Sequence, residues 1–286
     1  MALSDDVISR KIIIYKFAEV YKTNLDGINQ LFSLYYTLAK FEHHTIALHF
    51  YDMKFFDGNL TALLAAILHK LSKENNLTFT TDMLFVRNEF DFFLKNDFFQ
   101  DGEKVIDNEK NTLPLGKFFR DDKEDFISYL DNRLLQHDGL PKSNQEILVN
   151  IKVDLIEIFC NYNYHSRTKE PCFICGHYFP EDKILKLTIT DLGCGFLDPI
   201  KETTGIENTE EAIKWALTDG KTSIKGTPGG IGFKIIKEYA AKKRLIFQII
   251  TNDQYWDSDP GSIYEEFNKL AYPFCGTTIN LFFSWK

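Results

Sequence analysis

The chain has 286 residues and a net charge of −8, with 44% hydrophobic and 26% charged residues. This composition is typical of a globular protein with a sizeable core, and the length favours two domains or one large one. The acidic balance disfavours general nucleic-acid binding, which depends on a basic surface. No apolar run reaches the ~18 residues of a membrane helix, and the N-terminus lacks the apolar segment of a secretory signal. Five cysteines, an odd number, argue against a disulfide framework and indicate a reducing cytoplasm.

Up to about residue 96, the chain alternates between patterns typical of strands and of helices. β-Branched and aromatic residues predict strands at residues 10–20, 45–50 and 77–80. Apolar residues at helical spacing predict a helix over 24–40, and a second helix over 60–72 is apolar on nearly all faces, which indicates burial. This alternation indicates an α/β domain at residues 1–96. The polar stretch that follows, 97–140, is predicted to be a linker with a connecting helix.

Residues 141–286 are predicted to form a second domain of the α+β type. A long helix is expected over residues 143–164, and Asn208 opens a capping box for a shorter helix that Gly220 ends. Another helix is expected over residues 232–242. Strands are expected at 172–179, 185–191, 245–251 and 277–283. The second domain therefore has the elements for a layer of helices on a sheet.

Three polar residues share one face of the long helix. Glu157, Asn161 and His165 are spaced four residues apart, and apolar neighbours such as Ile158 and Phe159 anchor the helix in a core. A carboxylate on such a stripe can orient a water molecule, and an amide oxygen can bind a hard metal ion. A solvated polar face is the alternative explanation, since Glu and Asn are common on helix surfaces.

A second group of residues lies where the strand at 185–191 ends. The carboxylate of Asp191 can accept a hydrogen bond there from the amino group of an adenine ring. Gly193 and Gly195 let the backbone pass close to a ring, where a Cβ would clash. An ordinary turn that needs a positive φ would use the same Asp-x-Gly residues.

A third group of residues, rich in glycine, lies directly before the helix at 232–242. Gly229, Gly230 and Gly232 would expose backbone N–H groups that suit phosphate oxygens, and the helix dipole adds to the attraction. No Gly-Lys-Ser/Thr follows, so this is not a Walker A loop. A flexible loop would explain these glycines in isolation. In this order, the three groups together predict a site for an adenine ring, a metal ion and a triphosphate.

The order of these motifs resembles the GHKL ATPase superfamily. The motifs are Glu-x-x-x-Asn-x-x-x-His-Ser, Asp-x-Gly-x-Gly, Gly-Gly-x-Gly at a helix start, and Gly-Thr-Thr on the last strand. The resemblance covers residues 143–286, is closest in style to the anti-sigma-factor kinases, and implies a two-layer α/β sandwich that binds ATP and Mg²⁺. No helix with a substrate histidine precedes this part and no transducer domain follows it, which counts against a sensor histidine kinase and a gyrase-like machine.

The resemblance also implies roles for individual residues. Asn161 would hold Mg²⁺, Glu157 would be the general base, and Asp191 would bind adenine. The nucleotide would further be lined by Gly193 and Gly195 beneath the base, Thr277 through a water molecule, His165, and Gly229, Gly230 and Gly232 at the phosphates. Residues 197–228 would form a mobile lid, with Lys221, Thr222 and Ser223 touching the phosphates when it closes.

Residues 46–68 resemble the STAS fold of anti-sigma-factor antagonists. In that fold a strand, a turn with an Asp, a phosphorylatable serine and a helix form a switch. Asn59 stands at the position of the serine here, and an amide cannot accept a phosphoryl group. Thr61 is nearby but would lie inside the helix. The resemblance therefore implies a STAS-like α/β domain at residues 1–96 that serves for interaction or dimerisation rather than as a phosphorylation switch.

A Cys-x-x-Cys-x-His pattern, Cys172, Cys175 and His177, could contribute to a zinc site. One cysteine pair is too few on its own. The alternation of side chains along a strand would also turn the two cysteines to opposite sides. Core packing is therefore the favoured explanation for these residues.

These features predict a cytoplasmic, regulatory Mg-ATP-binding protein with slow hydrolysis. Closure of the lid would change what a protein partner, of STAS type or another effector, or a second copy of the chain can bind. One alternative is a serine/threonine kinase of the anti-sigma type that acts on a separate STAS partner. Another is a switch that binds nucleotide without turnover, and a role in a bacterial stress or defence operon is a third. Neither nucleic acid nor a membrane is expected among the partners.

Overall fold

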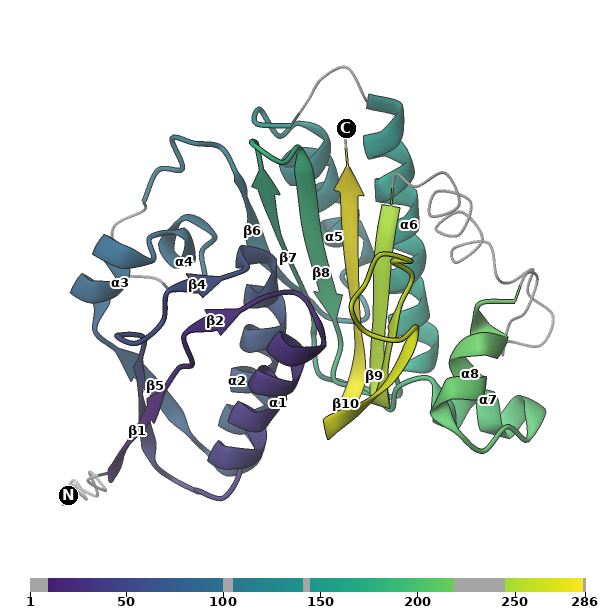
Figure 1. The fold of residues 1–286 in the computed structure, drawn as a ribbon, viewed down its shortest axis with the longest axis horizontal. Coiled ribbons are helices and arrows are strands. Elements are labelled where there is room, and N and C mark those ends of the chain that lie inside the picture. Colours follow the sequence, from purple (N-terminus) through teal and green to yellow (C-terminus); the bar gives the residue numbers. More distant parts are fainter. Residues whose placement is uncertain (1–9, 100–104, 141–144, 219–244, 285–286) are drawn as a thin grey trace, which may run out of the picture.

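The computed structural model describes residues 10–99, 105–140, 145–218 and 245–284 (Figure 1). Within these ranges the chain forms a mixed α/β structure that contains both parallel and antiparallel sheets. No helix in the described ranges has the length and apolar character that crossing a bilayer requires.

The first part of the chain forms a parallel sheet with two long helices on one face. Its strands are ordered β1-β3-β5, and all three run in the same direction. The elements are β1 (Ile12–Lys16), α1 (Leu25–Leu38), β3 (Thr45–His49), α2 (Thr61–Asn75) and β5 (Thr78–Thr81). Short pieces accompany them: β2 (Val20–Tyr21), β4 (Phe55–Phe56), α3 (Met83–Glu89) and α4 (Phe92–Lys95).

The two long helices of this part form where the sequence pattern predicts them. The Asn24 side chain accepts a hydrogen bond from the Gly27 N–H and caps α1, which satisfies one of the donors left free at a helix start. Helix α2 buries nine of its fifteen residues and ends at Asn76, whose φ of 52° lies in the left-handed region that asparagine tolerates. Such extensive burial requires partners on more than one side of α2.

The second sheet is antiparallel throughout and has the strand order β6-β7-β8-β10-β9. Its strands are β6 (Thr112–Phe118), β7 (Cys172–Phe179), β8 (Ile184–Thr190), β9 (Leu245–Asp257) and β10 (Phe267–Ser284). The helices of this part are α5 (Lys123–Tyr129), which continues in a π-helical turn (Leu130–Leu135), α6 (Gln145–His165), α7 (Leu197–Thr204) and α8 (Thr209–Ala216).

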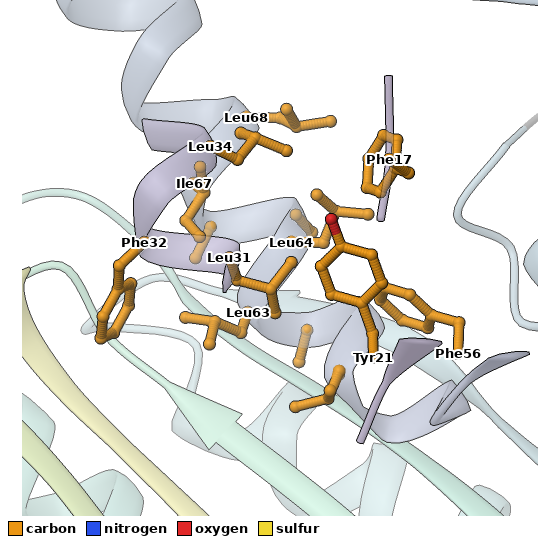
Figure 2. Close-up of a cluster of buried hydrophobic side chains, with 14 of the residues drawn as sticks. Phe17, Tyr21, Leu31, Phe32, Leu34, Phe56, Leu63, Leu64, Ile67 and Leu68 are labelled. Carbon is orange, nitrogen blue, oxygen red and sulfur yellow. The ribbon is translucent and has the colours of Figure 1, made fainter. Parts of the chain in front are cut away.

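Both faces of the second sheet are covered, each by a different hydrophobic cluster. On one face α5 and α6 pack through residues such as Phe126 and Phe159. On the other face α1 and α2 pack against the sheet, so that these two helices lie between the two sheets (Figure 1). Figure 2 shows the apolar side chains of α1 and α2, among them Leu31, Leu63 and Ile67, that fill this layer.

A row of buried polar side chains crosses the layer between α2 and the second sheet. The Asn59 amide donates to Thr188 Oγ1 at 2.8 Å, Thr188 donates to Asn280 Oδ1 at 2.7 Å, and Asn280 donates to Gln248 Oε1 at 2.9 Å. All four residues are 0–3% exposed, and the last three are cross-strand neighbours. This polar row fixes the first part of the chain on the sheet at one position, because its members pair with one another away from water. Asn59 also donates to Thr23 Oγ1, and Gln248 also donates to the Thr23 carbonyl and to Asp257.

The predicted helices and strands of the described ranges are present, most with bounds shifted by one to three residues, while β9 and β10 run further than expected. The stretch expected as a linker differs, since it contains β6, which pairs with β7 as an edge strand of the second sheet. Pro114 and Gly116 within β6 hide its strand character, and an edge position tolerates both.

Candidate functional site

Three segments converge at the end of β8. They are the last turn of α6, the loop Asp191–Gly195 that follows β8, and the adjacent stretches of β9 and β10. The register brings the last two together, because Thr278 pairs with Thr190 and Thr277 pairs with Thr251. Antiparallel pairing therefore places the end of β8 beside the interior of β9 and β10. The three segments meet there in a compact corner around Asp191.

Asp191 lies in this corner with 9% of its surface exposed. Its carboxylate accepts a hydrogen bond from the Gly193 N–H at 2.7 Å, and its own N–H donates to the Thr277 carbonyl at 2.9 Å. Burial raises the pKa of the Asp191 carboxyl to about 7, against the opposing effect of backbone hydrogen bonds from Gly193 and Thr277. A carboxyl withdrawn from water in this way is a strong acceptor for a donor group on a ligand.

Glycines allow the converging segments to touch. A Cβ on Gly193 would lie 2.4 Å from the Ser166 carbonyl oxygen, and one on Gly276 would lie 2.0 Å from the Asp191 carbonyl oxygen. Gly195 and Gly276 also have φ values of 75° and 87°, in the region where a side chain is strained. The sequence predicts that Gly193 and Gly195 leave room for an adenine ring. In the structure, the close packing of the loop against neighbouring segments is sufficient to explain why these positions are glycines.

Ser166, which ends the first motif, and two residues outside the motifs hold the loop in place. The Ser166 carbonyl accepts from the Cys194 N–H at 2.8 Å. The Asn252 side chain donates to the Cys194 carbonyl at 3.1 Å, and Thr251 Oγ1 accepts from the Phe196 N–H at 3.1 Å. The only sequence signal for Thr251 and Asn252 is that they form a Thr-Asn pair where the strand at 245–251 is predicted to end. Such pairs are typical of many strand ends.

Helix α6 presents Glu157, Asn161 and His165 as half-buried residues on one stripe. The structure joins one end of this stripe to the loop, because the Cys194 thiol contacts the His165 carbonyl at 3.3 Å. Glu157 lies about 12 Å farther along the helix axis. Burial lowers the pKa of the His165 imidazole, and the nearby Arg167 lowers it further, so that this side chain is neutral at pH 7.

The same half of α6 carries buried polar atoms that have no hydrogen-bond partner. They are Asp154 Oδ1, Asn163 Oδ1 and, directly after the helix, Ser166 Oγ. Asp154 is 1% exposed, and burial, reinforced by the charge of Glu157, raises its pKa to about 8. Sequence reasoning missed Asp154 because an acid between Val153 and Leu155 resembles any helical surface position. Unpaired buried polar atoms are costly, and three of the seven among the described residues lie on or directly after α6, which fits a helix that faces a polar ligand.

Six predicted site residues lie outside the described residues: Lys221, Thr222, Ser223, Gly229, Gly230 and Gly232. The expected lid overlaps the described part over residues 197–218, where it forms α7 and α8. Helix α8 is capped by Asn208 and packs through Ile213 against the sheet. A hollow of about 780 Å³ lies between α8 and the facing parts of β9 (252–254) and β10 (269–275), and Asn252 and Cys275 are among the residues that line it.

The cysteine pattern on β7 belongs to two different cores. Cys172 packs in the cluster under α6, and Cys175 packs in the cluster under α1 and α2. Burial raises the pKa of both thiols, which keeps them protonated and unsuited to a metal. The described residues contain no group of three or more metal-binding side chains.

A search with protein-family models finds no family that matches this chain. A search of curated proteins likewise finds no match. The geometry of the corner around Asp191 and the order of the sequence motifs therefore carry the functional argument.

Proposed function

We propose that this chain is a cytoplasmic, regulatory Mg-ATP-binding protein of the GHKL type with slow ATP hydrolysis. The observation that supports this best is the buried carboxyl of Asp191, held at a strand end by Gly193 and Thr277. A nucleotide base could donate its exocyclic amino group to that carboxyl. The predicted ligands for the metal ion and the water molecule, Asn161 and Glu157, lie half-buried on α6, and unpaired buried polar atoms on the same helix support a polar ligand beside it.

The proposal assigns a role to each residue of the predicted nucleotide site. Asp191 accepts a hydrogen bond from the base, and Thr277 supports the base through a water molecule. Asn161 supplies the amide oxygen for Mg²⁺, which when bound stabilises charge on the phosphates. Glu157 orients a water molecule for in-line attack on the γ-phosphate. The phosphate contacts of Gly230, Gly232, Lys221 and Thr222 rest on the sequence motifs alone.

The first part of the chain is proposed to be STAS-like. Its parallel sheet with alternating helices supports that assignment at the level of an α/β fold. Asn59, at the position expected for a phosphorylatable serine, is fully buried and donates to Thr188. If the protein were a kinase instead, the acceptor would have to lie on a separate molecule.

Thermal-shift and calorimetric titrations with Mg-ATP, Mg-ADP and a non-hydrolysable analogue test the proposal. We expect the wild type to gain thermal stability with nucleotide by mass action. Asp191→Asn and Asn161→Ala should abolish the gain. Lys54→Gln, which breaks an exposed ion pair with Glu19 in the first part of the chain, should keep it.

The results distinguish absence of nucleotide binding from three forms of activity that accompany binding. Absence of any shift at millimolar nucleotide would show that the chain is not an ATP-binding protein. If binding is present, release of free phosphate indicates an ATPase, whereas transfer of the γ-phosphate to a co-purified protein indicates a kinase. Binding without either product indicates a switch.

A further inference from the structure

Helix α1 contacts the part of β10 that supports Asp191. The Phe274 ring is stacked on Phe32 with centroids 4.7 Å apart and planes at 17°, and it meets Tyr35 edge-on at 5.2 Å. Tyr36 Oη donates to the Pro273 carbonyl at 2.6 Å. Only two residues after Phe274, Gly276 lies against the Asp191 carbonyl. An aromatic anchor in the first part of the chain is thus directly adjacent to the candidate site.

Regular sheet pairing does not hold this stretch of β10. Its register with β9 shifts between Lys269 and Phe274 and again between Phe274 and Thr277. A strand whose ladder is interrupted on both sides of a residue needs another element to set its position. Since Phe274 is 7% exposed and its ring contacts are with α1, this helix is that element.

Helix α2 reaches the other two segments of the corner. His69 Nε2 lies 2.6 Å from Glu170 Oε2, and the Glu170 carbonyl in turn accepts from Tyr162 Oη, in the last turn of α6, at 2.7 Å. Leu192, next to Asp191 in the loop, is buried in the same cluster as α1 and α2. Burial raises the pKa of the Cys275 thiol, but Lys70 on α2 lies close enough to oppose this effect. All three segments that meet at Asp191 therefore rest on the helices of the first part of the chain.

We infer that α1 and α2 hold the segments of the nucleotide site in place and that Phe32 and His69 are positioning residues for this site. This inference rests on the function proposed above. The first part of the chain does not act as a separate receiver that is tethered to an independent ATP-binding domain. Any event that shifts α1 or α2 changes the affinity for nucleotide, and by linkage nucleotide changes the stability of the first part.

A matched pair of substitutions tests this inference. Phe32→Leu and Phe50→Leu remove the same atoms from side chains that are each 1% exposed and belong to one cluster. Phe32 is stacked on Phe274, whereas Phe50 is stacked on Phe17 at 4.3 Å, within the first part of the chain. We expect calorimetry to show the Kd for Mg-ATP raised about tenfold by Phe32→Leu relative to Phe50→Leu, a typical coupling between sites. The two variants should lose a similar amount of thermal stability.

His69→Gln is a second variant, since it removes the contact with Glu170 without opening a cavity in the core. It should raise the Kd while its melting temperature stays near that of the wild type. Equal Kd values for wild type, Phe32→Leu and His69→Gln would overturn the inference, because the helices would then stabilise the fold without positioning the site.

A further measurement separates failure of this inference from failure of the proposed function. Alkylation of Cys275 and Cys194, mapped by mass spectrometry without nucleotide, reports how firmly the loops are held. Faster labelling of these thiols in Phe32→Leu than in Phe50→Leu supports positioning by α1 even if the wild type binds no ATP. Equal labelling, together with wild-type affinity in both variants, would show that the loops are held by the second sheet alone.

Discussion

Helices α2 and α6 cover opposite faces of the same sheet, but they differ in how their polar groups are satisfied. Nine residues of α2 are buried, and the polar side chains near its end are paired, His69 with Glu170 and Lys70 with Glu74. Helix α6 is longer and keeps Asp154 buried without a partner for one oxygen. Helix α2 therefore serves packing, whereas α6 retains costly polar groups that packing alone does not explain.

The largest expected effect concerns the packing helix. Leu63 on α2 is fully buried, so Leu63→Ala should lower the free energy of unfolding by about 2–5 kcal/mol, from lost apolar contact and a residual cavity. Urea denaturation followed by circular dichroism measures this. Val149→Ala, on an exposed position of α6, is the control and should change stability little. A loss below 1 kcal/mol for Leu63→Ala would contradict the central position of α2.

Substitution of Asp154 on α6 is expected to change the free energy of unfolding by a smaller amount and in the opposite direction. The pKa of Asp154 is raised to about 8 in the folded chain, while the unfolded chain loses this proton near its ordinary value of 3.8. The unfolded state therefore releases the proton first, and the folded state becomes progressively less favourable as pH rises from about 4 to about 8. Asp154→Asn removes this penalty, so it should stabilise the protein at pH 8 by about 1–3 kcal/mol, the cost of an unpaired buried polar group.

The pH dependence of that gain is its control. At pH 4 the carboxyl is protonated in the folded state and about half ionised in the unfolded state, so most of the penalty is absent and Asp154→Asn should change the free energy of unfolding little. Unfolding curves at pH 4, 6 and 8 would show a gain that grows along the series. A variant that is less stable than the wild type at pH 8 would mean that the Asp154 carboxylate has a favourable partner.

The smallest effect on stability is expected one turn farther along α6. Glu157 is half-buried and its charge raises the pKa of Asp154, so Glu157→Gln should lower that pKa and change stability by no more than about 0.5 kcal/mol. Hydrolysis of ATP should nevertheless fall by about 10²–10⁴-fold, as expected when a general base is lost. Phosphate release measured beside the melting temperature tests both parts. Unchanged hydrolysis would remove Glu157 from the chemistry.

The sequence predicts most secondary structure here because local signals are strong. Asn24 and Asn208 cap their helices as the pattern requires, and the apolar period of α1 matches its buried face. The position of α1 and α2 between two sheets was not predictable. The sequence of α2 indicates that the helix is buried on nearly all faces, but it does not indicate which sheets cover those faces. Strand β6 was missed because its pairing with β7 is a long-range contact between residues about 60 apart in the chain.

The candidate site was only partly predictable for a related reason. Asp191 and its glycines form a motif within five residues, so the sequence displays them together. Thr251 and Asn252 reach the same loop from a distant strand through side-chain hydrogen bonds, which leave no pattern along the chain. Ser166 and Gly276 lie within the motifs, but their contacts with the Cys194 N–H and the Asp191 carbonyl are between segments far apart in the chain.

The polar row from Asn59 to Gln248 has a consequence for assembly of the sheet during folding. Side chains alternate between faces, so a slip of β10 by one residue against β8 would turn Asn280 away from Thr188 and bring an apolar neighbour, Ile279 or Leu281, into the row. The Thr188 hydroxyl and the Asn280 amide oxygen would then lose each other as hydrogen-bond partners in a buried layer. The polar row therefore disfavours misregistered pairing of β8 with β10 and favours the native register.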